Sequence, residues 1–202
     1  MSATTSWIHG NALRVEDPGE YANVRHRGWG SELNYAGPRD DEDGQNLSWR
    51  WCHIGVPTPT PVDGVEPELG RIFVLYKTDS TSDLHITQID VYDAGNKLGS
   101  IPLGYDKAAN DWLGSGDHRS LDKYNQFAPP VNKYRVQNGI GLSFACLFTV
   151  IPPNEPETPA TQYWQLTIAA VGVEFIWPIL IEEQRATFEG KIPLGHVSQR
   201  QP

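Results

Sequence analysis

The sequence contains no long apolar run, no cluster of basic residues and only two cysteines among its 202 residues. No stretch approaches the roughly 20 apolar residues that a helix needs to span a bilayer. Lys and Arg are scattered, and the formal net charge is −9. An acidic surface of this kind repels phosphate backbones and anionic lipids. We therefore expect neither nucleic acid nor a membrane as a partner.

The N-terminus, Met1 to Trp7, has no basic region followed by an apolar one, so it does not read as a classical secretory signal. The expected location is the cytoplasm, and export by another route would leave no trace here. Cys52 and Cys146 both lie in strand-like runs. We favour two free, buried thiols, and the alternative is a disulfide between them as in an immunoglobulin-type sandwich.

Local catalytic motifs are also absent. The chain has no Gly-x-Ser-x-Gly elbow, phosphate-binding glycine loop or dinucleotide fingerprint, and its six histidines show no zinc-ligand spacing. Cys52 and His53 are neighbours in a predicted strand, so they point to opposite faces and are disfavoured as a catalytic pair. A carboxylate-pair glycosidase needs no local motif and stays open.

The dominant pattern in the sequence is an apolar residue at every second position. In Leu142–Ile151, positions 142, 144, 146, 148 and 150 fall on one face of an extended strand, which we expect to lie in the core. Similar strands are predicted at Leu47–Ile54, Arg71–Thr78, Leu84–Tyr92, Lys97–Leu103, Tyr163–Val171 and Val173–Ile181. Trp7–Val15 reads as a strand or a hairpin with a turn at Gly10-Asn11.

The phase of the Leu84–Tyr92 run slips, and a β-bulge near Thr87-Gln88 would restore it. The residues Asp93 to Asn96 then form a turn. The whole pattern predicts an all-β fold: a single antiparallel β-sandwich over residues 1–202, of jelly-roll or immunoglobulin-like type, with long irregular loops.

Four short motifs in the second half of the chain occur in a characteristic order. They are Ile89–Gly95, Gly116–His118, Gly139–Ser143 and Gly172–Phe175. This order resembles an uncharacterised bacterial family of small β-rich proteins of unknown function. The resemblance implies a β-rich fold and carries no activity. Ala94 stands where the resemblance leads us to expect glycine in the turn.

Two acidic segments can be considered as metal sites. In the loop Asp40–Asn46, Asp41 and Asp43 are the candidate calcium ligands, but the full twelve-residue calcium pattern is missing. We expect a solvated acidic turn, no cofactor, and no stability loss on calcium removal. The segment Asp111–Asp122 groups Asp111, Asp117, His118 and Asp122, which can bind a metal or act as acids and bases.

The chain has seven tryptophans, which carry more apolar area than any other side chain. Trp29 lies between two glycines and Trp112 lies in a long irregular segment, so these two are the candidate sugar-binding platforms. The tryptophans in predicted strands are expected in the core: Trp49, Trp51, Trp164 and Trp177.

The leading functional hypothesis is a non-catalytic structural or scaffolding protein that self-associates into a homo-oligomer. Its interface would use Trp112, Tyr124 and Phe127 from the irregular segment 104–138, because large aromatic residues dominate interface energetics. The alternative is a carbohydrate-binding module that binds a glycan through Trp29 and Trp112. A third reading is a metal-dependent or carboxylate-pair hydrolase built on Asp111–Asp122.

Overall fold

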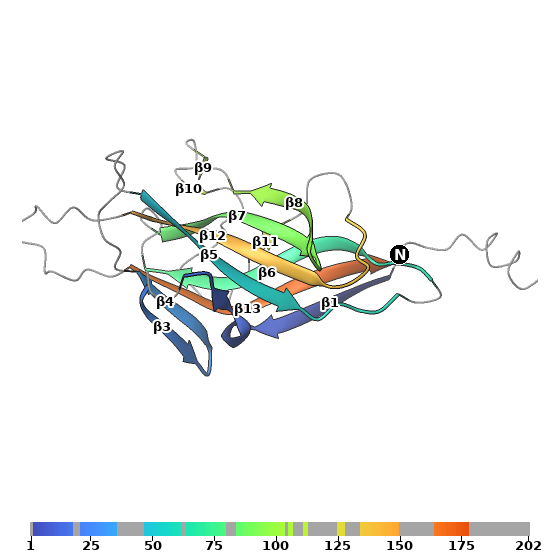
Figure 1. Ribbon diagram of the computed structural model, residues 1–202, viewed down its shortest axis with the longest axis horizontal. Coiled ribbons are helices and arrows are strands. Elements are labelled where there is room, and N and C mark those ends of the chain that lie inside the picture. The colour runs from blue at the N-terminus through green and yellow to red at the C-terminus, as the bar shows by residue number, and fades with distance from the viewer. Residues whose placement is uncertain are drawn as a thin grey trace, which may run out of the picture.

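The computed structural model describes residues 2–17, 21–35, 47–61, 64–79, 84–103, 105–106, 111–112, 125–127, 134–149 and 164–177. These residues form two antiparallel sheets, a short strand pair and one 3-10 turn, so the predicted all-β class is confirmed. Within these ranges, no helix has the length and apolarity needed to cross a membrane. Figure 1 shows the long strands of both sheets running roughly along the long axis of the molecule, with the hairpin labelled β3 and β4 at an angle to them.

The six-stranded sheet is organised around β13 (Trp164–Trp177). Its other strands are β1 (Ser2–His9), β3 (Tyr21–Arg27), β4 (Gly30–Tyr35), β6 (Glu68–Thr78) and β11 (Asn125–Phe127). The order is β11–β6–β13–β4–β3, and β1 also pairs with β13. One side of β13 pairs with β6, whereas the other side is shared between β4 near its start and β1 near its end.

The place where β1 ends and β4 begins is a tight backbone junction. A Cβ on Gly10, in the 3-10 turn η1 (Gly10–Ala12), or on Gly30 would overlap the carbonyl of Ile168 in β13. Gly30 also has φ of +145°, which side-chain-bearing residues rarely adopt. Glycine at these two positions therefore allows two strands to meet along one side of β13.

The five-stranded sheet has the order β2–β5–β12–β7–β8. Its strands are β2 (Arg14–Val15), β5 (Leu47–Val56), β7 (Leu84–Asp93), β8 (Asn96–Pro102) and β12 (Ile140–Thr149). A separate pair joins β9 (Tyr105–Asp106) to β10 (Asp111–Trp112). Buried side chains from both large sheets form one cluster. We call the side of each sheet that contributes to this cluster its core face, and the other side its outer face.

Strand β12 confirms the predicted alternation. Leu142, Phe144, Cys146 and Phe148 are at most 1 % exposed and belong to the buried cluster, while Val150 lies outside the described residues. The predicted bulge is also present, because Ala145 pairs with Gln88 and Cys146 pairs with Ile86. Thr87 is the extra residue, and its hydroxyl donates to the Ala145 carbonyl at 3.2 Å.

One prediction about a strand boundary is wrong. Gly172 does not separate two strands, because β13 continues through it to Trp177. For Trp7–Val15, the strand alternative is confirmed by β1, and the turn at Gly10-Asn11 is present as η1. The hairpin alternative is not formed, since β1 and β2 belong to different sheets. At both glycines another group approaches the backbone: the Trp7 ring at Gly172 and the Ile168 carbonyl at Gly10.

The two cysteines are free and buried, as favoured from the sequence. They lie on adjacent strands of one sheet, β5 and β12, rather than on opposite sheets as in the immunoglobulin arrangement. The hydrogen bond with Cys52, reinforced by burial, raises the pKa of the Cys146 thiol well above its ordinary value. Cys146 is therefore a neutral thiol in the core.

The turn between β7 and β8 contains a strained residue. Ala94 has φ of 51°, in the left-handed region that alanine adopts at a cost of about 1–2 kcal/mol. Glycine has no such penalty, although it makes the unfolded chain more flexible. We expect Ala94→Gly to stabilise the protein by about 0.5–1 kcal/mol in urea unfolding. Ala12→Gly, at an exposed position without positive φ, is the control and should not stabilise it.

Candidate functional site

The outer face of β5 carries Trp49, Trp51 and His53 at alternate positions. Trp49 is 51 % exposed, whereas Trp51 and His53 are partly buried. The sequence placed Trp49 and Trp51 in the core, and this is wrong for both, because the core face of β5 presents Cys52 and Ile54 instead. As expected, Cys52 and His53 point to opposite faces of the strand.

Next to these aromatic residues, polar residues extend across the five-stranded sheet. His53 of β5 pairs with Ser143 of β12, and Ser143 pairs with Asp90 of β7. Directly paired residues in an antiparallel sheet share a face. Glu16 reaches His53 from the end of β2, and Lys97 reaches Asp90 from β8. We call Glu16, His53, Ser143, Asp90 and Lys97 the polar row.

His53 connects the first half of the polar row. Its Nδ1 lies 2.8 Å from the Ser143 hydroxyl oxygen, and its Nε2 lies 3.9 Å from a Glu16 carboxylate oxygen. A carboxylate beside Nε2 favours the tautomer that carries the proton there. Nδ1 then accepts a hydrogen bond from the Ser143 hydroxyl.

Asp90 anchors the other half, although it is only 4 % exposed. Lys97 Nζ donates to one of its carboxylate oxygens at 2.7 Å, and Gln88 Nε2 donates to the other at 2.7 Å. Burial raises the pKa of Asp90, but the hydrogen bonds from Lys97, Ser100 and Gln88 outweigh it, so the net pKa is lowered. The hydrogen bond to Asp90 in turn raises the pKa of Lys97. Asp90 and Lys97 are therefore both charged at neutral pH.

The order carboxylate, imidazole, hydroxyl matches the groups of a serine hydrolase. Acyl transfer also needs N–H donors aimed at the developing oxyanion. Ser143 lies in the middle of β12, and the strand is paired along its length with β5 on one side and β7 on the other. The backbone N–H groups next to Ser143 are therefore directed within the sheet toward β5 and β7, and not toward an oxyanion above the sheet. The row is better suited to holding hydroxyl groups than to acyl transfer.

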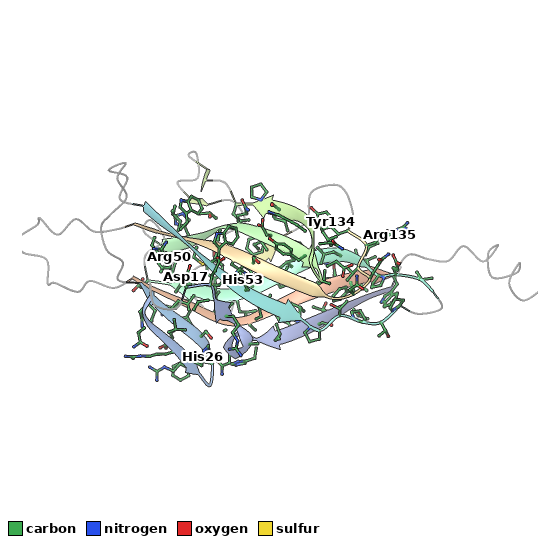
Figure 2. All side chains as sticks on the ribbon, in the orientation of Figure 1. Asp17, His26, Arg50, His53, Tyr134 and Arg135 are labelled. Atoms are coloured by element: carbon green, nitrogen blue, oxygen red, sulfur yellow. The ribbon has the colours of Figure 1, made fainter. Side chains whose placement is uncertain are left out.

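A second histidine–serine pair lies on the other sheet. His26 Nδ1 is 2.8 Å from the Ser31 hydroxyl oxygen, and that hydroxyl donates to the Gly10 carbonyl at 2.9 Å. Figure 2 shows His26 on the β3–β4 hairpin, away from His53 on β5. Because Ser31 is fully buried and donates to backbone, this pair holds the hairpin against the Gly10 junction.

The candidate residues from the sequence are scattered. Trp29 forms part of the turn between β3 and β4, is 56 % exposed, and has the Arg27 guanidinium carbon 5.8 Å from its ring centroid. Trp112 pairs with Tyr105 in the β9–β10 ladder, and its side chain lies outside the described part. Phe127 is 2 % exposed, so its ring packs into the core of its own chain. Tyr124, Asp41 and Asp43 lie outside the described residues.

The part of the chain that the structure describes contains no candidate metal site. No group of three or more His, Cys, Asp or Glu side chains in those ranges is placed to hold an ion. Of the Asp111–Asp122 segment, only Asp111 and Trp112 are within the described residues.

The polar row was missed from the sequence because its members are far apart along the chain. His53 and Ser143 are 90 residues apart, and they meet only through the register of β5 and β12. The available signal was the predicted strand Leu47–Ile54, whose two-residue alternation places Trp49, Trp51 and His53 on one face. What the sequence did not show was that this face points outward.

The model of a family of unknown function, DUF6623, matches residues 1–176. This range contains the entire polar row and both large sheets apart from Trp177, the last residue of β13. It extends well beyond the second half of the chain, where the sequence resemblance was seen. No curated protein matches the chain.

Proposed function

Because the chain belongs to a family of unknown function, DUF6623, its activity must be inferred from its own geometry, and we propose that it is a non-catalytic carbohydrate-binding protein. The binding surface is the outer face of the five-stranded sheet. Trp49 and Trp51 stack on sugar rings, and the polar row hydrogen-bonds to their hydroxyls. A neutral, hydroxyl-rich ligand also suits a chain of net charge −9, which repels anionic ligands.

The observation that carries this proposal is the position of Trp49 and Trp51 on one outer face. A residue and its second neighbour in a strand are roughly 6.7 Å apart, which is about the width of a sugar ring. A sugar ring has an apolar face of C–H groups that packs on an indole ring. Trp49 leaves half of its large apolar surface in water, and a stacked sugar would remove that surface from water.

The polar row complements this aromatic surface. His53 and Glu16 are partly exposed, with 41 % and 56 % of their side-chain surfaces accessible. Imidazole and carboxylate groups supply the donors and acceptors that sugar hydroxyls need. Ser143 and Asp90 are buried and fix the positions of His53 and Lys97 from below. Fixed polar groups lose little conformational entropy on binding.

We take the two sheets to be the layers of a single β-sandwich, of the jelly-roll or immunoglobulin-like type expected from the sequence. The single buried cluster, to which both sheets contribute side chains, supports this architecture. In such an arrangement the outer face of β5 is directed away from the other sheet and can receive an extended ligand.

The test is calorimetric titration of the full chain with linear hexaoses of β-1,4-linked glucose, xylose and mannose. We expect at least one of these to bind. Trp49→Ala and Trp51→Ala should each weaken that binding about 30-fold, because aromatic residues at the centre of a binding surface typically contribute about 2 kcal/mol or more.

Trp29→Ala is the matched control, since Trp29 is equally exposed but lies on a hairpin of the other sheet. Its affinity should stay within about twofold of the wild type. Absence of binding to all three hexaoses would contradict the proposal. Loss of binding in Trp29→Ala alone would move the site to the hairpin.

Self-association is a second candidate function, and one observation at a sheet edge favours it. Strand β2 has two residues and pairs with Arg14↔His53 and Val15↔Cys52, whereas its neighbour β5 has ten. β2 therefore covers only a small part of that edge, and strand addition by a second copy is a common way to complete a sheet.

We expect light scattering at micromolar concentration to report a mass well above the 22.5 kDa of one chain. Trp112→Ala should lower this mass if the segment that contains β9 and β10 contributes to the contact. A strictly monomeric wild-type protein would remove self-association as a function.

A further inference from the structure

A second aromatic surface lies on the outer face of the six-stranded sheet. Trp7 of β1 pairs with Gly172 of β13, and Gly172 pairs with Phe73 of β6. The three residues therefore form one row across three strands. The flanking residues Val171 and Val173 are fully buried on the core face, which places the row on the outer face.

The Trp7 ring lies flat against the sheet in this row. A Cβ on Gly172 would be 2.8 Å from each of Trp7 Cδ2, Cε2 and Cε3. Equal distances to three atoms of the six-membered ring mean that the Cβ direction of Gly172 points at the face of that ring. Because Cβ atoms point out of the sheet, the ring plane runs parallel to it. One face of Trp7 covers Gly172 and the opposite face is directed outward.

Neighbouring residues hold the ring in this orientation. Trp7 stacks on Phe73 with 5.7 Å between ring centroids and an interplanar angle of 23°. Trp7 is nevertheless 44 % exposed, whereas Phe73 is 7 % exposed. A rigid, half-exposed aromatic ring is pre-organised for stacking, since little side-chain freedom is left to lose.

Polar groups stand beside Phe73, the stacking partner of the Trp7 ring. Arg71 donates two hydrogen bonds to Glu174, at 2.8 and 2.9 Å, and its guanidinium carbon lies 5.7 Å from the Phe73 ring centroid. The hydrogen bonds from Arg71 lower the pKa of Glu174, so the carboxylate is ionised. Arg71 keeps 49 % of its side chain exposed. The pair thus places a guanidinium and a carboxylate beside the Phe73 ring on which Trp7 stacks.

We propose that Trp7, Arg71 and Glu174 form a second carbohydrate-binding site on the outer face of the six-stranded sheet, so that one molecule binds two glycan chains. This inference rests on the proposed carbohydrate binding at Trp49 and Trp51. The two sites belong to the outer faces of different sheets, which share a core, so they face away from each other. One glycan chain cannot lie on both faces, and the protein therefore cross-links neighbouring chains.

The experiment counts sites and tests cross-linking separately. Calorimetric titration uses the hexaose that binds best among the β-1,4-linked glucose, xylose and mannose hexaoses. We expect two sites per chain in the wild type. Trp7→Leu should keep only the site at Trp49, and Trp49→Ala should keep the site at Trp7 unchanged while the site at Trp49 weakens about 30-fold. Leucine keeps an apolar cover over Gly172 while removing the aromatic face. Circular dichroism of each variant confirms that it is folded.

The second measurement is the turbidity of a soluble polymer of the same sugar mixed with the protein. The wild type should raise the turbidity, and each single variant should lose this effect while still binding the hexaose. One site in the wild type, lost in Trp49→Ala and kept in Trp7→Leu, would overturn the second site and leave the proposed function standing. No binding in any arm would overturn both.

Discussion

Phe144→Ala is expected to destabilise the protein by about 3–5 kcal/mol, the usual cost of emptying a buried aromatic site. Phe144 is fully buried on the core face of β12, between Cys52 of β5 and Ile89 of β7. Since β12 is the middle strand of its sheet, its neighbours are held in place and cannot collapse into the space left behind. Urea unfolding followed by tryptophan fluorescence measures the loss.

Trp49→Ala is the control for this prediction, because it removes an aromatic ring of larger size from the same sheet. Trp49 is half exposed, so its removal should cost less than about 1 kcal/mol. Equal losses in the two variants would show that the core face of the sheet had been misidentified.

Asp93→Asn is expected to cost about 2–4 kcal/mol, because it removes a charged acceptor that three part-buried N–H groups share. Asp93 ends β7 and is 5 % exposed. Its carboxylate accepts hydrogen bonds from the backbone N–H groups of Gln137, Asn138 and Gly139, at 2.8 to 3.0 Å. These residues lead directly into β12. An asparagine would turn an N–H₂ group toward at least one of these N–H donors.

The effect of Asp93 should depend on pH. Burial raises the pKa of the carboxyl, but the backbone hydrogen bonds outweigh it, so the folded-state pKa lies below the ordinary value of 3.8. The stabilisation is therefore complete well above pH 3.8 and is lost as the pH falls through the folded-state pKa. The difference in stability between wild type and Asp93→Asn should be constant from pH 7 to 5 and shrink below pH 4.

Asp79→Asn provides the matched control. Asp79 is exposed and accepts one backbone hydrogen bond, from Gln165 at 3.0 Å. Its substitution should cost less than about 1 kcal/mol. If Asp93→Asn is no more damaging than Asp79→Asn, the carboxylate does not anchor the entry to β12.

Strand positions followed directly from residue periodicity in much of this chain. The alternation in β12 identified its core face, and the slip in β7 located the bulge at Thr87. Periodicity describes a strand by itself, so it cannot report what crosses over it. For that reason Gly172 was taken as a strand end, although in the structure the Trp7 ring occupies the space above it.

The candidate site was less predictable, because it depends on which face of β5 points outward. Both faces of this strand carry large or apolar residues, and tryptophan alone does not distinguish them. Burial of Cys52 and exposure of Trp49 are set by the pairing of β5 with β12 and by the position of the second sheet. Asp93 presents the same difficulty, since a turn aspartate reveals nothing of the distant N–H groups it binds.

The position of β12 and β13 in the chain has a consequence for synthesis on the ribosome. β13 holds together the sheet in which β1 takes part, yet some 160 residues separate the two strands in sequence. At a synthesis rate of about 5–20 residues per second, β1 is made roughly 10–30 s before its partner strand β13. β5 is likewise made before its partner β12. The early strands are thus made with their edges open, and their protection during this interval falls to whatever cellular factors shield nascent chains.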